Sequence, residues 1–320
     1  MWGPFGRGIA NYETNNLAGD YVNLDGFINS NHLPAEYADS AERCYLPFAD
    51  WVEEQISARQ GETYVLGING AQGTGKSTLA RLISEYLSST YQRRVAILSI
   101  DDLYLTLAER ESLAQQVHPM LRTRGVPGTH DVSLGRSIIE QLKALRPDQA
   151  VSIPRFDKSR DDRCEATDWS SVSGPVDLLI FEGWCIASRA QLDADLQEPV
   201  NDLEATADED GRWRKYVNDQ LRDNYAQLFS ALDSLLFLQA PSFDAILGWR
   251  IEQEHRLRDS AAADADAVMS DAEVADFIQY YERVTLHNFN VLPTLAGATI
   301  KLGLDHQAVS LEFAKAPGFG

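Results

Sequence analysis

The sequence has few cysteines and no long hydrophobic run. Its 320 residues include three cysteines, Cys44, Cys164 and Cys185. Three scattered cysteines are too few for a disulfide framework or a zinc site, and an odd number leaves at least one free thiol. We therefore expect a chain that works in a reducing cytoplasm. Because no run of about 18 apolar residues occurs and the first residues lack the basic and apolar segments of a secretory leader, we expect no membrane span and no membrane partner.

Basic side chains are scarce relative to acidic ones. The sequence contains 28 Lys and Arg against 48 Asp and Glu, a formal net charge of −20. A surface of this charge repels the phosphates of nucleic acids and of anionic lipids, so we expect no nucleic-acid partner. The 44% of hydrophobic residues can bury one large core, or one core with a smaller appendage. The oligomeric state stays open at this stage.

Short apolar runs alternate with helical patterns from Thr63 onward. The four runs are residues 64–68, 95–100, 177–181 and 234–239. Runs of this length separated by helices are typical of buried parallel strands with crossover helices on both faces of the sheet. The expected fold is therefore α/β, with a doubly wound and mostly parallel sheet.

Helical patterns flank this predicted sheet. A helical extension is expected over residues 1–60, before a domain of residues 61–320. Its evidence is an amphipathic stretch with apolar side chains at helical spacing, at Phe48, Trp51, Val52 and Ile56. A long late helix is expected after the capping-box pair Ser270 and Glu273, and a mobile loop over residues 260–270.

The segment GINGAQGTGKST contains a phosphate-binding pattern. The pattern G-x-x-x-x-G-K-[ST] lies directly after one predicted strand and directly before a helix. Its glycines let backbone N–H groups turn toward the β-phosphate, and the positive end of the following helix adds attraction. Lys76 is expected to reach the β- and γ-phosphates, and the Ser77 hydroxyl to join the magnesium shell, so the expected cofactors are ATP and Mg²⁺. The predicted nucleotide-binding residues are Gly70, Ala71, Gln72, Gly73, Thr74, Gly75, Lys76, Ser77 and Thr78.

Carboxylates follow two of the predicted strands. Asp101 and Asp102 come after the run 95–100, and Glu182 ends the run 177–181. Ligands of α/β proteins bind at the carboxyl ends of parallel strands. A carboxylate at Asp101 can take a proton from an acceptor hydroxyl, and Glu182 can hold magnesium in the manner of a Walker B acid. The predicted magnesium ligands are Ser77, Asp101 and Glu182, and the alternative for Asp101 is a helix N-cap or a solvated strand end.

Several basic residues lie in predicted loops of this acidic chain. They are Arg122, Arg124, Arg155, Lys158 and Arg163. Such side chains are suitable donors to the carboxylate or phosphate of a small anionic acceptor, and surface ion pairs with the abundant acids are the alternative. His130 beside Asp131 is expected to position the substrate and not to transfer a proton, although a turn that caps the next helix explains Asp131 equally well.

The segment SIDDLY resembles a motif of the P-loop small-molecule kinases that include uridine kinase, phosphoribulokinase and pantothenate kinase. It matches S-x-D-x-[FL]-Y at Ser99, Asp101, Leu103 and Tyr104, and the pair Glu182-Gly183 also matches. The resemblance implies that Asp101 is the catalytic base, acting with Lys76 and Glu182.

Four further segments are similar to the D-glycerate 3-kinases of plants and fungi. They are residues 122–131, 153–159, 198–221 and 248–274. The resemblance, over about residues 61–290, implies phosphorylation of D-glycerate to 3-phosphoglycerate. Together with the basic side chains and His130 described above, the predicted acceptor-binding residues are Asp102, Tyr104, Arg122, Arg124, His130, Arg155 and Lys158.

The resemblance also implies a lid at about residues 248–272, whose Arg250 closes on the transferring phosphate. Solvated helix pairs such as Glu252 with Arg256 are the alternative for the arginines of this segment. The aromatic residues Trp213, Trp249, Tyr280 and Tyr281 are expected in the core.

The absence of two motifs narrows the class of nucleotide-binding protein. The chain has no N-K-x-D segment of a regulatory GTPase and no L-S-G-G-Q-like segment of an ABC-type ATPase. A nucleoside kinase of the uridine type or a pantothenate kinase is the main alternative, since its larger acceptor needs an apolar or stacking pocket. A non-kinase ATPase is less favoured.

Overall fold

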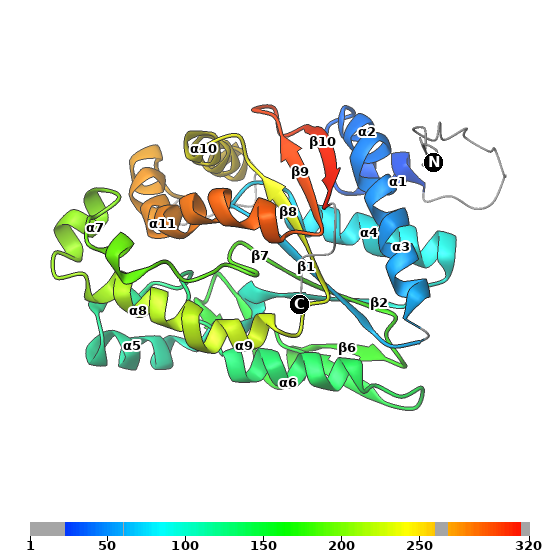
Figure 1. Ribbon diagram of the computed structural model, residues 1–320, viewed down its shortest axis with the longest axis horizontal. Coiled ribbons are helices and arrows are strands. Elements are labelled where there is room, and N and C mark those ends of the chain that lie inside the picture. Colours follow the sequence, from blue (N-terminus) through cyan, green and yellow to red (C-terminus); the bar gives the residue numbers. More distant parts are fainter. Residues whose placement is uncertain (1–22, 60, 260–267, 315–320) are drawn as a thin grey trace, which may run out of the picture.

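The centre of the molecule is a six-stranded sheet (Figure 1). The computed structural model describes residues 23–59, 61–259 and 268–314. The strand order is β10-β9-β8-β1-β7-β2, and the pairs are parallel except for β10 against β9. The strands are β1 Tyr64–Gly70, β2 Val95–Ser99, β7 Leu178–Gly183, β8 Ser234–Gln239, β9 Ala298–Leu302 and β10 Ala308–Phe313. This architecture confirms the predicted mostly parallel α/β fold.

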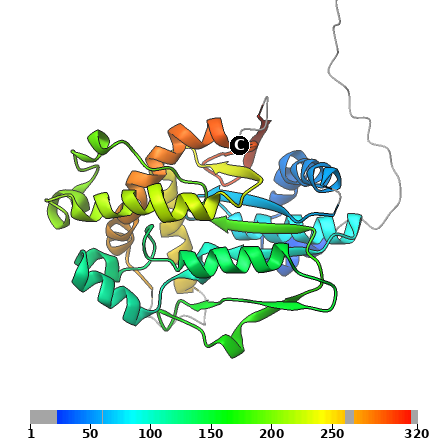
Figure 2. The same ribbon diagram turned by 60° about the horizontal axis from the view of Figure 1, so that its bottom comes forward.

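Helices cover both faces of this sheet (Figures 1 and 2). Helix α4 packs on β1, β2 and β7, and α11 packs on β8. The strands β1 and β7 are buried along their whole length, which explains their nearly continuous apolar sequences. The helices are α1 Leu24–Ser30, α2 Tyr37–Ser40, α3 Leu46–Ala58, α4 Lys76–Tyr91, α5 Leu107–Gln116, α6 Val132–Lys143, α7 Asp202–Ala207, α8 Arg212–Gln220, α9 Ala226–Phe229, α10 Phe243–Asp259 and α11 Asp271–Leu295.

Short elements connect the helices and strands. In two small antiparallel sheets, β3 Ala150–Ile153 pairs with β6 Ser170–Ser173, and β4 Phe156–Asp157 pairs with β5 Asp162–Arg163. The single-turn helices are η2 Ile100–Leu103, η3 Pro119–Arg122, η4 Ala166–Asp168 and η5 Asp193–Leu196. Two π-helical turns, η1 Ala41–Tyr45 and η6 Leu221–Tyr225, continue directly into α3 and α9.

The N-terminal helices share the core of the sheet. Phe27 of α1 and Phe48 of α3 belong to the same cluster of buried side chains as the strands, and α3 packs against α4. The Ser40 hydroxyl donates to Gln307 Oε1 at 2.6 Å and accepts from the Ala308 N–H at 2.9 Å. The amphipathic stretch predicted before residue 60 is therefore a helix, α3, and residues 1–22 lie outside the described part.

The predicted late helix is α11, and its capping box is formed as expected. The Ser270 hydroxyl accepts from the Glu273 N–H at 3.3 Å, and Glu273 Oε2 accepts from the Ser270 N–H at 2.7 Å. The loop predicted to be mobile falls mostly on residues 260–267, which lie outside the described residues. Within the described part of the chain, no helix is both long and apolar enough to cross a membrane.

Buried ion pairs hold the segment around α7 and α8. Arg283 of α11 donates to both carboxylate oxygens of Glu204, at 2.7 and 2.6 Å, and to the backbone carbonyls of Asp195 and Glu198. The exposed fractions of the two paired side chains are 8% and 1%. Arg283 therefore joins α7 and the turn before it to α11, which gives Glu204 a structural role.

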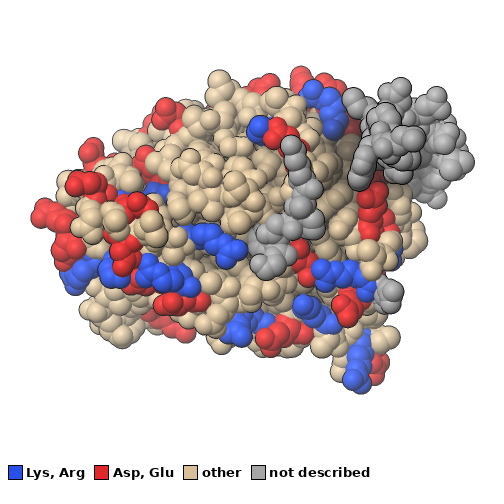
Figure 3. All heavy atoms as spheres, viewed as in Figure 1, with Lys and Arg blue, Asp and Glu red and all other residues tan. Residues whose placement is uncertain are grey.

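Charges on the surface are interspersed. On the face drawn in Figure 3, acidic and basic side chains stand beside one another. Exposed pairs such as Lys215 with Asp219 and Arg222 with Asp193 account for part of this arrangement. Pairs of this kind contribute little to stability because water screens them.

Candidate active site

The phosphate-binding turn joins the end of β1 to the start of α4. Gly73 and Gly75 have φ angles of 77° and 81°, in the left-handed region that favours glycine. Gly73 also has little room for a side chain, because a Cβ atom there would lie 3.0 Å from the Cβ atom of Trp249 in α10. Both glycines therefore suit the shape of the turn, and Gly73 also suits its close contact with α10.

The side chains of this turn fold back over its own backbone. Thr74 Oγ1 and Lys76 Nζ both donate to the carbonyl oxygen of Ala71, at 2.8 and 3.0 Å. Burial lowers the pKa of Lys76, and the charges of Glu182 and Asp101 oppose that shift. Lys76 therefore lies close to both carboxylates that the sequence singled out.

A hydroxyl and a carboxylate meet at the start of α4. Ser77 Oγ donates to Glu182 Oε1 at 2.9 Å, and Glu182 is only 4% exposed. Glu182 lies inside β7, one residue before its end, and pairs in register with Ile68 of β1 and Ser99 of β2. Hydroxyl and carboxylate oxygens are ligands that Mg²⁺ prefers, so these residues fit a magnesium ion beside the phosphates.

Asp101 lies in the single turn η2 that follows β2. Its N–H donates to Ser99 Oγ at 3.3 Å, so Ser99 and not Asp101 is the cap of this turn. Asp101 Oδ1 accepts from the Tyr104 hydroxyl at 3.0 Å, and Oδ2 accepts from Lys158 Nζ at 2.6 Å. Burial alone would raise the pKa of Asp101, but Lys158 and Lys76 outweigh it and hold that pKa below its usual range. The carboxylate is therefore ionised at neutral pH.

Asp102 points to a different neighbour. Its Oδ1 accepts from the Phe156 N–H at 3.1 Å, at the start of the β4–β5 hairpin. Burial raises the pKa of Asp102, and this backbone hydrogen bond partly opposes the shift. Asp102 thus anchors the hairpin that carries Lys158, a role that the sequence pattern did not predict.

The predicted basic cluster is divided between the site and the surface. Lys158 contacts Asp101, and Arg124 pairs with Asp161 and lies 5.7 Å above the Phe156 ring. In contrast, Arg122 is an exposed partner of Glu111 at 3.2 Å, and Arg155 is exposed. Arg163 is a scaffold residue, since it donates to the carbonyl oxygen of Tyr104 at 2.7 Å and pairs with Asp131 at 3.4 Å.

Arg250 and Tyr281 border the same region. Burial raises the pKa of Tyr281, Asp101 raises it further, and Arg124 and Arg250 lower it, which places these charges around one phenol. Arg250 pairs with Glu254 in the next turn of α10. Its Nη1 is shielded from solvent and has no hydrogen-bond partner among the described residues. Arg250 is therefore a partly buried cation, 14% exposed, with an unused donor.

The outer part of the predicted lid has ordinary contacts. Arg256 pairs with Glu252 at 3.7 Å on the exposed side of α10. This is the solvated helix pair expected from the sequence as the alternative to a lid arginine. Arg258 donates to the carbonyl oxygen of Met269 at 3.2 Å. The described parts of the lid segment are residues 248–259 and 268–272.

His130 is buried beside Asp101. It stacks on Tyr104 with ring centroids 4.5 Å apart, and its Nδ1 lies 2.6 Å from the Tyr225 hydroxyl. Burial lowers the pKa of His130 to about 3, so the ring is neutral near pH 7. The next residue, Asp131, is the N-cap of α6 and accepts from the Leu134 N–H at 2.9 Å.

Three residues near the site were not predicted from the sequence. Arg110 is fully buried and donates to the carbonyl oxygens of Arg122 and Asp161, at 2.7 and 2.5 Å, so it joins the two loops. His306, in the β9–β10 turn, lies with Nδ1 3.2 Å from the Gly73 carbonyl oxygen. Tyr225 contacts His130. The contacts with Asp161, Gly73 and His130 span 51, 233 and 95 residues, and no local pattern indicates them.

The aromatic residues expected in the core are mostly buried. Trp213, Trp249 and Tyr281 are 2%, 3% and 4% exposed, and Tyr280 is partly buried. Trp249 stacks on His306 with centroids 4.4 Å apart and donates from Nε1 to the carbonyl oxygen of Leu304 at 2.9 Å. The β9–β10 turn is therefore held against both α10 and the phosphate-binding turn.

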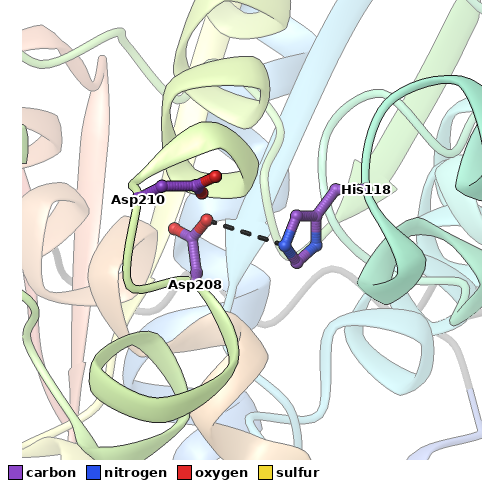
Figure 4. Close-up of side chains that lie close together, drawn as sticks. All are labelled: His118, Asp208 and Asp210. Atoms are coloured by element: carbon purple, nitrogen blue, oxygen red, sulfur yellow. Dashed lines mark ion pairs between the residues drawn. The ribbon is translucent and has the colours of Figure 1, made fainter.

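A second group of His and Asp side chains lies near α8 (Figure 4). His118 Nε2 is 3.9 Å from Asp208 Oδ1, and Asp210 is close to both. However, the Asp208 oxygens accept from the N–H groups of Trp213 and Arg214, and Asp210 accepts from Arg212. His118 Nδ1 accepts from the Met120 N–H, which leaves the ring proton on Nε2. Hydrogen bonds thus explain this group without a metal ion.

Comparisons with known proteins agree with this geometry. No model of a protein family matches the chain. The chain is 33% identical over 236 residues to the uncharacterized kinase mug58 of Schizosaccharomyces pombe. The aligned region covers 69% of this chain and 79% of that protein. It is 31% identical over 261 residues to the chloroplastic D-glycerate 3-kinase of Arabidopsis thaliana, over 74% of this chain and 52% of the plant protein. It therefore spans about half the length of the plant relative.

A solved structure of a kinase is also similar to this chain. The D-glycerate 3-kinase from Cryptococcus neoformans superposes with a TM-score of 0.72 and 25% identity, over 84% of this chain and 99% of that one. The parallel sheet, the glycine turn and the Ser77–Glu182 pair define a P-loop kinase, which is a phosphotransferase. More particularly, the chain belongs to the family of P-loop kinases that includes D-glycerate 3-kinase.

Proposed function

We propose that this chain transfers the γ-phosphoryl group of ATP to the 3-hydroxyl group of D-glycerate, giving 3-phosphoglycerate. The names of the plant and fungal relatives support this choice of acceptor. The observation that carries it is the setting of Asp101, which lies near Lys76 of the phosphate-binding turn and accepts from Tyr104 and Lys158. The carboxylate of Asp101 can accept the proton of an alcohol, and the cations beside it can bind a negatively charged group of the same small molecule.

The donor end of the site is built by the turn before α4. Backbone N–H groups of the turn and the Lys76 ammonium bind the phosphates, and burial strengthens these interactions. Ser77 and Glu182 would hold Mg²⁺, with Asp101 nearby. When bound, Mg²⁺ would neutralise charge that develops on the β- and γ-phosphate oxygens.

The acceptor end depends on Asp101. Its Oδ2 keeps a lone pair beyond the bond from Lys158, so it can accept the proton of the acceptor hydroxyl. Tyr104 holds the other oxygen and fixes the plane of the carboxylate. His130 is neutral and its Nδ1 is already bonded to Tyr225, so it is not the base. Catalysis then consists of positioning and charge stabilisation.

The acceptor is small, so charged contacts must supply most of its affinity. D-glycerate has about seven heavy atoms, and a ceiling of about 1.5 kcal/mol per atom allows at most roughly 10 kcal/mol before binding costs. We assign its carboxylate to Lys158, which contacts Asp101, and to Arg124 and Arg250, whose charges act on Tyr281. Arg122 and Arg155 are exposed, and we therefore leave them out of this clamp.

A nucleoside or pantothenate acceptor needs a free apolar or aromatic surface. The rings closest to Asp101 already pack on one another, since Tyr104 stacks on His130 and meets Phe156 edge-on with centroids 5.3 Å apart. Trp184 packs edge-on against Tyr281 at 4.8 Å. This packing favours the smaller acceptor. The proposed compartment is the cytoplasm, where the unpaired thiols of Cys44, Cys164 and Cys185 stay reduced.

The test is ADP release from MgATP with a panel of acceptors. The panel contains D-glycerate, L-glycerate, uridine, pantothenate and ribulose 5-phosphate, with a reaction lacking acceptor as the control. Selective turnover with D-glycerate supports the proposal. Turnover with uridine or pantothenate, or ADP release that needs no acceptor, contradicts it.

Lys158→Met is expected to raise the KM for D-glycerate by roughly tenfold or more, because a charge-assisted hydrogen bond to the substrate carboxylate is lost. The KM for MgATP is expected to stay unchanged. Steady-state kinetics with each substrate varied in turn measures both constants. Arg160→Met, on the same hairpin and also exposed, is the matched control. A rise in the KM for MgATP of equal size would show that Lys158 does not serve the acceptor.

A further inference from the structure

Tyr225 is the hydrogen-bond partner of His130 Nδ1. The Tyr225 oxygen accepts from the Gly128 N–H at 2.9 Å, and this N–H group offers no acceptor for the hydrogen of the phenol. Among the described residues, the acceptor within hydrogen-bond distance is His130 Nδ1, at 2.6 Å. A neutral imidazole whose Nδ1 accepts a hydrogen bond carries its proton on Nε2. His130 therefore presents an Nε2–H donor.

No described residue accepts a hydrogen bond from this N–H group. His130 is 4% exposed, and its Nε2 is shielded from solvent. A buried donor without a partner is costly, and natural proteins rarely keep one without a function. Tyr104 stacks on this ring and donates to Asp101, so one side chain separates His130 from the proposed catalytic carboxylate.

The local fold holds this arrangement in place. Tyr225 ends the π-helical turn η6, and such turns frequently occur at functional sites. Its ring meets the edge of His130 at 5.8 Å, while Tyr104 stacks on the face of His130 and donates to Asp101. Tyr225, His130, Tyr104 and Asp101 thus form one continuous chain of contacts that ends at the catalytic carboxylate.

We propose that Tyr225 fixes the tautomer of His130, and that the Nε2–H group of His130 donates a hydrogen bond to an oxygen atom of the acceptor. The inference rests on the proposed function, because it assigns this group to the acceptor side of the kinase site. A hydroxyl or carboxylate oxygen of a small hydroxy acid satisfies the donor, whereas an ammonium group does not. Tyr225 is then a positioning residue that acts through His130.

The first test reads the tautomer without any substrate. In ¹⁵N-histidine-labelled wild-type protein, two-bond ¹H–¹⁵N spectra distinguish a protonated Nε2 from a protonated Nδ1, and the His130→Gln variant identifies the His130 signals. The Nε2–H form is expected in the wild type, and Tyr225→Phe is expected to add the Nδ1–H form. A wild-type ring protonated at Nδ1 overturns the proposal, whatever the acceptor proves to be.

The second test uses the acceptor that turns over in the panel. Tyr225→Phe and His130→Phe are expected to raise the KM for the acceptor by roughly tenfold to a hundredfold, and to leave the KM for MgATP unchanged. His130→Gln keeps an N–H donor and is expected to restore part of the loss. Tyr86→Phe, which removes a phenol bonded to Asp50 at 2.7 Å, is the matched control. Equal acceptor KM values for His130→Phe and the wild type would overturn the proposal.

Discussion

Asp101→Asn lowers kcat for phosphoryl transfer by about 10²–10⁴-fold, the range that removal of a general base produces. Asparagine keeps the size of the side chain but cannot take the proton of the acceptor hydroxyl. MgATP binding is expected to stay close to that of the wild type, because the proposed phosphate contacts lie in the turn of residues 70–78. Single-turnover kinetics measures the chemical step, and titration with a fluorescent ATP analogue measures binding.

The matched control for this variant is Asp157→Asn. Asp157 is a carboxylate on the hairpin of Lys158, and it accepts from the Ser159 hydroxyl at 2.6 Å within its own turn. Its replacement changes the net charge by the same amount and is expected to leave kcat within about twofold of the wild type. Near wild-type turnover by Asp101→Asn, with binding intact, would show that Asp101 is not the base.

Arg283→Met destabilises the protein by about 3–5 kcal/mol, because it leaves the buried Glu204 carboxylate without its counter-charge. Two N–H···carboxylate bonds are lost, together with the bonds to the carbonyl oxygens of Asp195 and Glu198. Unfolding in urea, followed by circular dichroism, measures the free energy of unfolding.

Two controls distinguish the loss of an exposed arginine from the burial of an unpaired carboxylate, in their effects on the free energy of unfolding. Arg256→Met removes an exposed arginine paired with Glu252 and is expected to change the free energy of unfolding by less than about 0.5 kcal/mol. Arg283→Met combined with Glu204→Gln is expected to recover part of the loss, since no unpaired charge then stays buried. A cost below about 1 kcal/mol for Arg283→Met alone would contradict a structural role for this pair.

The sequence predicted the parts of the fold whose signals are local. The strands β1, β7 and β8 are nearly continuous apolar runs because helices cover both faces of the sheet, and β2 at the sheet edge is also mostly apolar. The phosphate-binding turn was predicted since its glycines and Lys76 lie within one short segment. The strands β9 and β10 were not predicted, because Lys301 interrupts the first and the second is largely exposed.

The acceptor side of the site depends on contacts between distant segments. Lys158 reaches Asp101 across 57 residues, Tyr225 reaches His130 across 95, and His306 reaches Gly73 across 233. The positions of basic residues in the sequence do not distinguish Lys158 and Arg124, which lie near Asp101 and Tyr281, from Arg122, which pairs with Glu111 at the surface. The identity of the clamp residues therefore depends on the tertiary structure.

The most direct test of the central claim is ³¹P NMR of the product formed from MgATP and D-glycerate. The wild-type protein is expected to give the resonance of 3-phosphoglycerate together with ADP, and Asp101→Asn is expected to give neither above the background without enzyme. Formation of inorganic phosphate alone would identify an ATPase. A resonance of 2-phosphoglycerate, or no product with D-glycerate, would contradict the assignment of the acceptor and its 3-hydroxyl group.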